Sequence, residues 1–235
     1  MNRLEMRETM RVLLGETIED FYKDIECNKY LSVGQLKVAS TLLCLQTHKN
    51  VETVAFNDPL LDADDSRREG RYGLPDDFLS LKDVQIKDGA DWYPLTRWNY
   101  DDYKMYARNA SGGRPTAYKP EFGSTSQGNP APGDLWFWPY PDRSSPDQYV
   151  YQVSFFQKPT PLDEDEDISE LMESAHLAVC YHAAMTLSRK GKDRALIQEL
   201  SALWGDEIAM LKDLVGLSDQ TGDIRMKNYY SDDCD

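Results

Sequence analysis

The chain has 235 residues, of which 40% are hydrophobic, and its formal charge of −15 comes from 26 basic and 41 acidic residues. No apolar run approaches the roughly 18–20 residues that a membrane span needs, and the scattered charges of the first residues exclude the apolar core of a signal peptide. We therefore expect a cytoplasmic product, large enough for one or two domains, that does not wrap nucleic acid. None of the four cysteines lies in a C-x-x-C pair, which predicts free thiols.

Two helices are predicted at the start of the chain. From about residue 4 to residue 25, apolar side chains recur at steps of three and four residues, with Glu and Arg on the other side. A second helix is predicted over residues 32–50, where Ser32 and Gln35 have the spacing of a capping box. This helix is apolar on two faces, so we expect one face to pack in a bundle and the other to contact a neighbouring subunit.

Residues 51–162 carry the patterns of strands. Apolar and polar side chains alternate over residues 149–157, which is typical of a strand with one buried face. With residues 135–138 it predicts two strands around a turn rich in Pro, Ser and Asp. A hairpin is predicted around residues 87–89. Further predictions are short strands over residues 51–56 and 116–122 and a short helix over residues 99–108.

Two more helices are predicted over residues 167–190 and 193–215. The acidic run 163–167 favours a helix start in which Asp163 is the cap and Glu166 lies in the first turn. Trp204 falls on the apolar stripe of the last helix, so we expect it in the core. The predicted fold class is α+β: the N- and C-terminal helix pairs form a four-helix bundle (residues 1–50 and 163–216), with an antiparallel β-module inserted over residues 51–162.

Few residues suggest chemistry. The acidic run lacks the spacing of a calcium-binding loop, which favours a helix start over a cation site. His176 and Cys180 share a helix face, but zinc needs two further ligands, so satisfied core histidines at 176 and 182 are the favoured interpretation. Residues 111–114 fit a turn. The chain has no nucleophile elbow, phosphate-binding loop, dinucleotide motif or zinc-protease motif. We expect no catalytic residue, no cofactor and no metal.

Six aromatic residues accompany the predicted strands. Trp136 and Trp138 are two residues apart on one strand, so their side chains share a face. A sugar-stacking platform and packing in the core of the β-module both fit this pattern, and core packing is favoured. The six residues are Trp92, Tyr93, Trp98, Trp136, Trp138 and Tyr140.

Five short motifs follow one another along the chain: LPDDF at 74–78, WYPLTRW at 92–98, GRPTAY at 113–118, DLWFWPYPD at 134–142 and FFQKPTPL at 155–162. In sequence and in order, ahead of two C-terminal helices, they resemble motifs of the bacteriophage head-to-tail adaptor proteins. That family includes the connector and tail-tubular proteins of tailed phages. The resemblance covers most of residues 1–215 and has no counterpart for residues 217–235.

The resemblance implies a structural virion protein without enzymatic activity, assembled in the host cytoplasm and located at the head–tail interface. It implies a ring, usually of twelve copies, that joins the portal protein to a tail or nozzle protein and forms part of the DNA channel. From the charge of −15 we expect acidic side chains to line the lumen, so that genomic DNA passes without specific binding. Two alternatives are a monomeric β-module on a helical stalk that binds carbohydrate or a host protein, and a phage lysis or nuclease enzyme.

The last segment, residues 217–235, has few apolar residues and an acidic end. Alone, it cannot bury enough surface to offset an ordering entropy of about 1–2 kcal/mol per residue. We expect a flexible docking tail that becomes ordered against the portal or a neighbouring subunit; a plain disordered terminus is the alternative. The expected anchors are the large apolar and aromatic residues of this segment. They are Ile224, Met226, Tyr229 and Tyr230.

Overall fold

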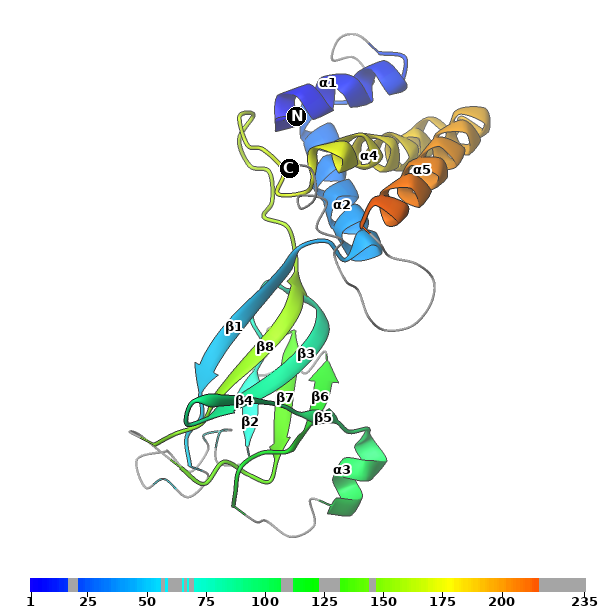
Figure 1. Ribbon diagram of the computed structural model, residues 1–235. Coiled ribbons are helices and arrows are strands. Elements are labelled where there is room, and N and C mark those ends of the chain that lie inside the picture. The colour runs from blue at the N-terminus through cyan, green and yellow to red at the C-terminus, as the bar shows by residue number, and fades with distance from the viewer. Residues whose placement is uncertain are drawn as a thin grey trace, which may run out of the picture. The chain divides into compact units, whose positions relative to one another are not determined.

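The chain forms two compact units in the computed structural model (Figure 1). Met1–Leu45 and Lys158–Asp235 make a helical unit, and Gln46–Gln157 make a β unit. The described residues contain five α-helices and two sheets, which confirms the mixed α+β class. The structure describes residues 1–16, 21–55, 58, 65, 67, 70–106, 112–122, 132–143 and 147–215.

The helical unit is organised around one central helix. Helix α4 packs against α1, α2 and α5, and its small side chains, among them Ala178, Ala183 and Ala184, are fully buried. Small residues let the surrounding helices approach closely. The elements are α1 (Arg3–Leu13), α2 (Asp24–Leu42), the 3-10 turn η2 (Glu173–Ala175), α4 (His176–Gly191) and α5 (Arg194–Val215).

Gly34 marks the closest approach of α2 to α4. A Cβ atom built on Gly34 would lie 2.8 Å from the carbonyl oxygen of Val179 and 3.3 Å from its Cγ1. Glycine in a helix interior costs about 0.5–1 kcal/mol relative to alanine, so this residue needs a compensating role. Here the missing side chain allows the two helix backbones to lie almost in contact.

The two N-terminal helices differ from the predicted ones. The first helix ends at Leu13 instead of continuing to residue 25, and Gly15 follows with a left-handed φ of +74°. The second helix begins at Asp24 instead of residue 32. Ser32 is therefore an interior residue, and its hydroxyl donates to the carbonyl oxygen of Asn28 over 3.2 Å. The predicted cap at Ser32 is wrong, because the helix begins at Asp24, directly after its cap residue Lys23.

The end of the second helix also differs. Leu43 adopts a left-handed φ of +47° and ends α2, so residues 46–50, predicted as helix, instead begin strand β1 (Gln46–Glu52). The strand predicted over residues 51–56 thus lies mostly earlier in the chain. The side chains of β1 are mostly polar, so apolar periodicity does not indicate a strand at these residues.

The acidic run does not start a helix. Asp167 accepts hydrogen bonds from the backbone N–H groups of Asp163 and Glu164, each over 2.8 Å, which makes a turn. Helix α4 begins only at His176, so the predicted start near residue 167 is wrong. Aspartate side chains that bond nearby N–H groups compete with the helix, which explains the shift. The last predicted helix, over residues 193–215, is confirmed as α5.

The β unit is a sandwich of two four-stranded sheets with orders β1-β8-β3-β4 and β2-β7-β6-β5. Their inner faces share one core, in which Tyr151 of the first sheet contacts Tyr72 and Phe137 of the second at ring distances of 5.3 and 5.0 Å. The remaining elements are β2 (Arg71–Gly73), β3 (Phe78–Asp88), β4 (Asp91–Pro94), β5 (Thr96–Arg97), α3 (Tyr100–Tyr106), β6 (Ala117–Phe122), β7 (Gly133–Trp138) and β8 (Val150–Gln157).

The strands β7 and β8 do not pair with each other. β7 pairs with β2 and β6, whereas β8 pairs with β1 and β3, so the predicted strand pair is wrong. The connection between them, which contains Pro139 and Pro141, crosses from one sheet to the other. The predicted alternation is confirmed in the first half of β8, whereas Ser154 and Phe156 are buried together with Phe155, so the second half is covered on both faces. The hairpin at residues 87–89, between β3 and β4, is confirmed. One pair, β5 with β6, is parallel, so the module is not purely antiparallel.

Candidate interaction surfaces

The predicted docking residues lie outside the residues that the structure describes. They are Ile224, Met226, Tyr229 and Tyr230. Their role stays a prediction.

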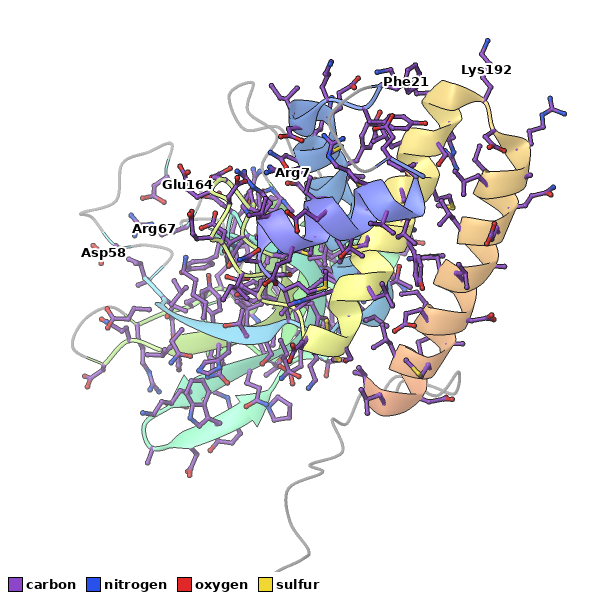
Figure 2. All side chains as sticks on the ribbon, turned by 90° about the horizontal axis from the view of Figure 1, so that it is seen from above. Arg7, Phe21, Asp58, Arg67, Glu164 and Lys192 are labelled. Atoms are coloured by element: carbon purple, nitrogen blue, oxygen red, sulfur yellow. The ribbon has the colours of Figure 1, made fainter. Side chains whose placement is uncertain are left out.

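Three arginines at four-residue steps form a row along α1, and their partners fix the N-terminal helix to the rest of its unit. Arg3 Nη2 and Arg7 Nη1 both donate to Asp165 Oδ1, over 2.7 and 3.0 Å. Arg11 forms ion pairs with Glu16, which lies between α1 and α2, and with Asp24, the first residue of α2. Figure 2 labels Arg7 on α1.

This arginine row was expected on the exposed side of the helix, yet Arg7 and Arg11 are buried. Their hydrogen bonds keep the guanidinium groups satisfied; the bond to Asp165 raises the pKa of Arg7. The bonds from Arg7 and Arg3 in turn lower the pKa of Asp165. The acidic run therefore serves as an anchor for α1. Spacing alone could have found the row, but not its partners.

Helix α2 has an exposed apolar face in addition to its buried one. Ile25, Val33 and Leu36 are exposed, with Ile25 at 79%, and their spacing of eight and three residues places them on one side of the helix. The opposite side, with Leu31 and Val38, is fully buried. We call the exposed side the α2 face.

Helix α5 has a similar apolar face. Leu203, Met210 and Leu214 are exposed, with Met210 at 56%, and they recur at steps of seven and four residues. We call this side the α5 face. Rows of exposed apolar side chains on a helix indicate contacts with other molecules.

The predicted aromatic cluster is divided between the two sheets: Trp92 and Tyr93 lie in β4 of the first sheet, whereas Trp136 and Trp138 lie in β7, on the outer surface of the second sheet. In β7, Leu135 and Phe137 point into the core, so Trp136 and Trp138 share the opposite face. The prediction that these tryptophans pack in the core is therefore wrong, although they do share a face.

Trp136 lies between two cations on that surface. The Arg71 guanidinium lies 5.4 Å from the ring centroid, and the buried Lys119 ammonium lies 5.0 Å from it. Tyr100 and Tyr103 of α3 also contact Lys119, at 5.3 and 5.0 Å. Cation–π contacts of this kind hold α3 on the sheet.

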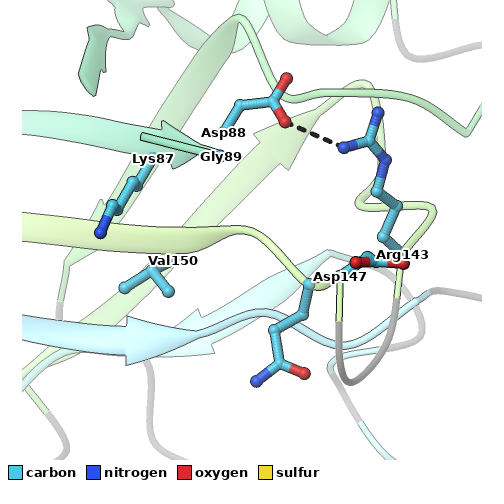
Figure 3. Close-up of a pocket in the computed structure, with 7 residues that line it drawn as sticks. Lys87, Asp88, Gly89, Arg143, Asp147 and Val150 are labelled. Carbon is cyan, nitrogen blue, oxygen red and sulfur yellow. Dashed lines mark hydrogen bonds and ion pairs between the residues drawn. The ribbon is translucent and has the colours of Figure 1, made fainter. Parts of the chain in front are cut away.

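A hollow of about 630 Å³ lies beside the β3–β4 turn, lined by residues that include Lys87, Asp88, Arg143 and Asp147 (Figure 3). Arg143 Nη1 lies 2.9 Å from Asp88 Oδ1, and Arg114 also reaches Asp88, over 3.9 Å. Its lining carries charges of both signs. These groups suit polar contacts with a partner.

The candidate zinc ligands are fully buried structural residues. His176 Nε2 lies 3.1 Å from the carbonyl oxygen of Leu171, and the Cys180 thiol donates to the carbonyl oxygen of Met6 over 3.5 Å. Burial lowers the pKa of His176 and raises that of Cys180 to about 12, so the thiol stays neutral and unreactive. In the part of the chain that the structure describes, no group of three potential ligands could hold a metal ion.

His182 and Trp204 form an unexpected polar pair. Their rings lie 5.7 Å apart, and His182 Nδ1 and Trp204 Nε1 are buried without hydrogen-bond partners. The prediction of a satisfied histidine is therefore wrong for His182. Trp204 is only partly buried, because one edge of α5 remains open to solvent.

The comparison with known proteins rests on a family model. A search of curated proteins found no match, whereas the family model for the SU10 adaptor protein matches residues 1–227. Among the described helices, none is long and apolar enough to cross a membrane. The matched range covers both units, in agreement with the resemblance carried by the five short motifs. The chain therefore belongs to the SU10 adaptor protein family, a family of phage head-to-tail adaptors.

Proposed function

We propose that the chain forms a ring, of twelve copies, that joins the portal protein to a tail or nozzle protein and surrounds part of the DNA channel. Membership of the SU10 adaptor protein family supports a structural role in the virion rather than an enzymatic one. The observation that supports a ring is the pair of exposed apolar faces on the helical unit.

A ring needs a heterologous contact, in which one patch of a subunit meets a different patch of the next. The α2 face and the α5 face are two such patches on one unit. Ile25 and Val33 of one copy would be buried by Met210 and Leu214 of its neighbour. Each copy then uses both faces, and the contact closes by rotation.

The ring contact is tested with charged substitutions on each face. Leu36→Glu and Met210→Glu each place a carboxylate in the proposed contact, whereas Val12→Glu changes an exposed apolar residue of α1 outside both faces. In the presence of the portal, native mass measurements should show rings for the wild type and for Val12→Glu, and no rings for the other two. Rings of undiminished yield with Leu36→Glu and Met210→Glu would refute the proposed contact.

The C-terminal segment is proposed to dock the chain on the portal or on a neighbouring copy. Ile224, Met226, Tyr229 and Tyr230 are the large side chains of this segment, and aromatic residues are favoured anchors of interfaces. Deletion after Gly216 should leave the melting temperature unchanged and abolish joining to the portal. Undiminished affinity of the shortened chain for the portal would contradict this role.

DNA is proposed to pass the lumen without being held. The support is the formal charge of −15, because phosphates are repelled by carboxylates. Fluorescence anisotropy with labelled duplex DNA at physiological salt should show no binding. Tight binding that weakens steeply with added salt would show that cations line the path instead.

A second candidate is a monomeric β-module that binds carbohydrate or a host protein. It is favoured by tryptophans that lie outside the core on both sheets: Trp92 of β4 in the first sheet is 39% exposed, and Trp136 of β7 in the second sheet is half-buried. Its test is the same mass measurement, because this function requires no ring. Saccharide binding by a chain that stays monomeric with the portal present would favour it.

A further inference from the structure

Strand β1 forms an open edge of the first sheet. Its seven residues, QTHKNVE, pair with β8 on one side, and no other described strand pairs with β1. The register runs from Gln46 opposite Phe156 to Glu52 opposite Val150 without a bulge. The strand contains no proline. Natural proteins usually block an exposed edge with bulges, prolines or several charges, and β1 has few of these protections.

The register shows which backbone groups face outward. Thr53 N–H donates to the carbonyl oxygen of Tyr149 over 2.8 Å, which continues the pairing by one residue. Hydrogen-bonded pairs alternate with non-bonded pairs in an antiparallel ladder. Residues 47, 49 and 51 therefore bond to β8. The N–H and C=O groups of residues 46, 48, 50 and 52 point away from β8.

A hollow of about 390 Å³ lies beside this edge. Phe155 and Thr47 contribute to its lining from the two paired strands, and Asp76 and Asp77 also line it. His48 and Lys49 complete the strand side. A chain that extends along β1 could place apolar side chains beside Thr47 and Val51, the half-buried side chains of this strand, and basic side chains near the carboxylates.

Residues 224–230, IRMKNYY, have the matching pattern. Ile224 and Met226 alternate with Arg225 and Lys227, which is the period of a strand. The stretch contains no acidic residue, although the chain as a whole has a charge of −15. It spans seven positions, the length of β1, and lies within the 20 residues that follow Val215.

We propose that residues 224–230 of a neighbouring copy add to the open edge of β1 as a further strand. This inference rests on the proposed docking role of the C-terminal segment and names the surface that receives it. The backbone groups of residues 46, 48, 50 and 52 provide the hydrogen bonds. The alternation of Ile224 and Met226 with the two basic residues sets the face that turns toward Thr47 and Val51.

The test is amide hydrogen exchange, resolved to single residues, on the full chain assembled with the portal. The amides of His48 and Asn50 face outward and should be protected only when the strand is added. The amides of Lys49 and Val51 bond to β8 and serve as an internal control, because they stay protected in every case. Ile224→Asp with Met226→Asp should restore rapid exchange at residues 48 and 50 alone. The matched control, Ser218→Asp with Gln220→Asp, adds the same charge outside the alternating stretch and should exchange like the wild type.

A mixing experiment identifies the donor. Isotope-labelled chain with the Ile224→Asp and Met226→Asp changes is assembled with an excess of unlabelled wild-type chain, and protection should return at His48 and Asn50 of the labelled copy. If the labelled variant copy stays unprotected at His48 and Asn50 although wild-type copies surround it, donation by a neighbour is refuted. Equal, rapid exchange at both amides in wild type and variant would overturn the strand site. If both amides exchange rapidly in the wild type while the deletion after Gly216 still abolishes joining to the portal, the docking role stands and only this surface is refuted.

Discussion

Gly34→Ala is the sharpest test of how the helical unit is packed. In an unobstructed helix, this change would stabilise the protein by about 1 kcal/mol. In α2, the new Cβ would lie 2.8 Å from the carbonyl oxygen of Val179. That oxygen belongs to the backbone of α4 and cannot rotate away, so the two helices must separate. Overpacking of this kind costs about 1–3 kcal/mol.

Gly205→Ala provides the matched control. Gly205 lies inside α5, and a Cβ atom there would have no neighbour within 4 Å. The gain in helix propensity is the same in both variants and cancels in their difference. We therefore expect the Gly205→Ala protein to be more stable than the Gly34→Ala protein by about 1–3 kcal/mol.

Urea unfolding followed by circular dichroism at 222 nm measures this difference, because the signal reports mainly on the helical unit. Gly205→Ala should raise the midpoint above that of the wild type, and Gly34→Ala should not. Equal stabilisation by the two changes would show that α2 and α4 are not in close contact at Gly34.

Changes at three further positions test other parts of the structure. Asp165→Asn keeps an amide oxygen but removes the negative charge that Arg3 and Arg7 share. Since the pKa of Asp165 is lowered from 3.8, its stabilising effect is present above about pH 4 and lost as the pH falls further, so thermal melts should show a less stable variant at pH 7 with a flatter acid limb. Gly133→Ala should lower the free energy of unfolding of the β unit by more than about 2 kcal/mol, so that it unfolds at lower urea, because φ is +130° and a Cβ would lie 2.2 Å from the Glu121 carbonyl oxygen. Trp204→Phe should change the free energy of unfolding by less than about 0.5 kcal/mol or raise it, because it removes a buried N–H without a partner. Trp204→Ala should lower the free energy of unfolding by about 2 kcal/mol in the same urea measurement.

Local patterns predicted several elements well. Apolar side chains at helical spacing located α5 almost to the residue, and the alternation in β8 located its buried face. The β3–β4 hairpin followed from the turn chemistry around Gly89, which has a left-handed φ of +65°. In each case the signal lies within one short stretch of chain.

The features that could not be predicted depend on contacts between distant residues. Asp165 holds Arg3 and Arg7 from more than 150 positions away in the sequence, so an acidic run that suits a helix start becomes an anchor. The separation of β7 and β8 into two sheets depends on β1 and β3 occupying both sides of β8. The open edge of β1 follows from the same pairing. No periodicity in its polar sequence shows which side remains free.

The strength of the proposed ring contact can be estimated from the α2 and α5 faces. Each face offers three apolar side chains that are already partly covered, and complete burial of an exposed one stabilises by about 1.5–3 kcal/mol. Each face thus contributes on the order of 5 kcal/mol, so one contact, which buries one face of each copy, gains about 10 kcal/mol against an association cost of about 4–15 kcal/mol. A single contact between two copies is therefore weak, whereas copies held side by side on a portal bury both faces without meeting that cost again. We expect sedimentation to find the isolated chain monomeric at micromolar concentration and to find rings only with the portal; stable rings of the isolated chain would show that further surfaces contribute to the contact.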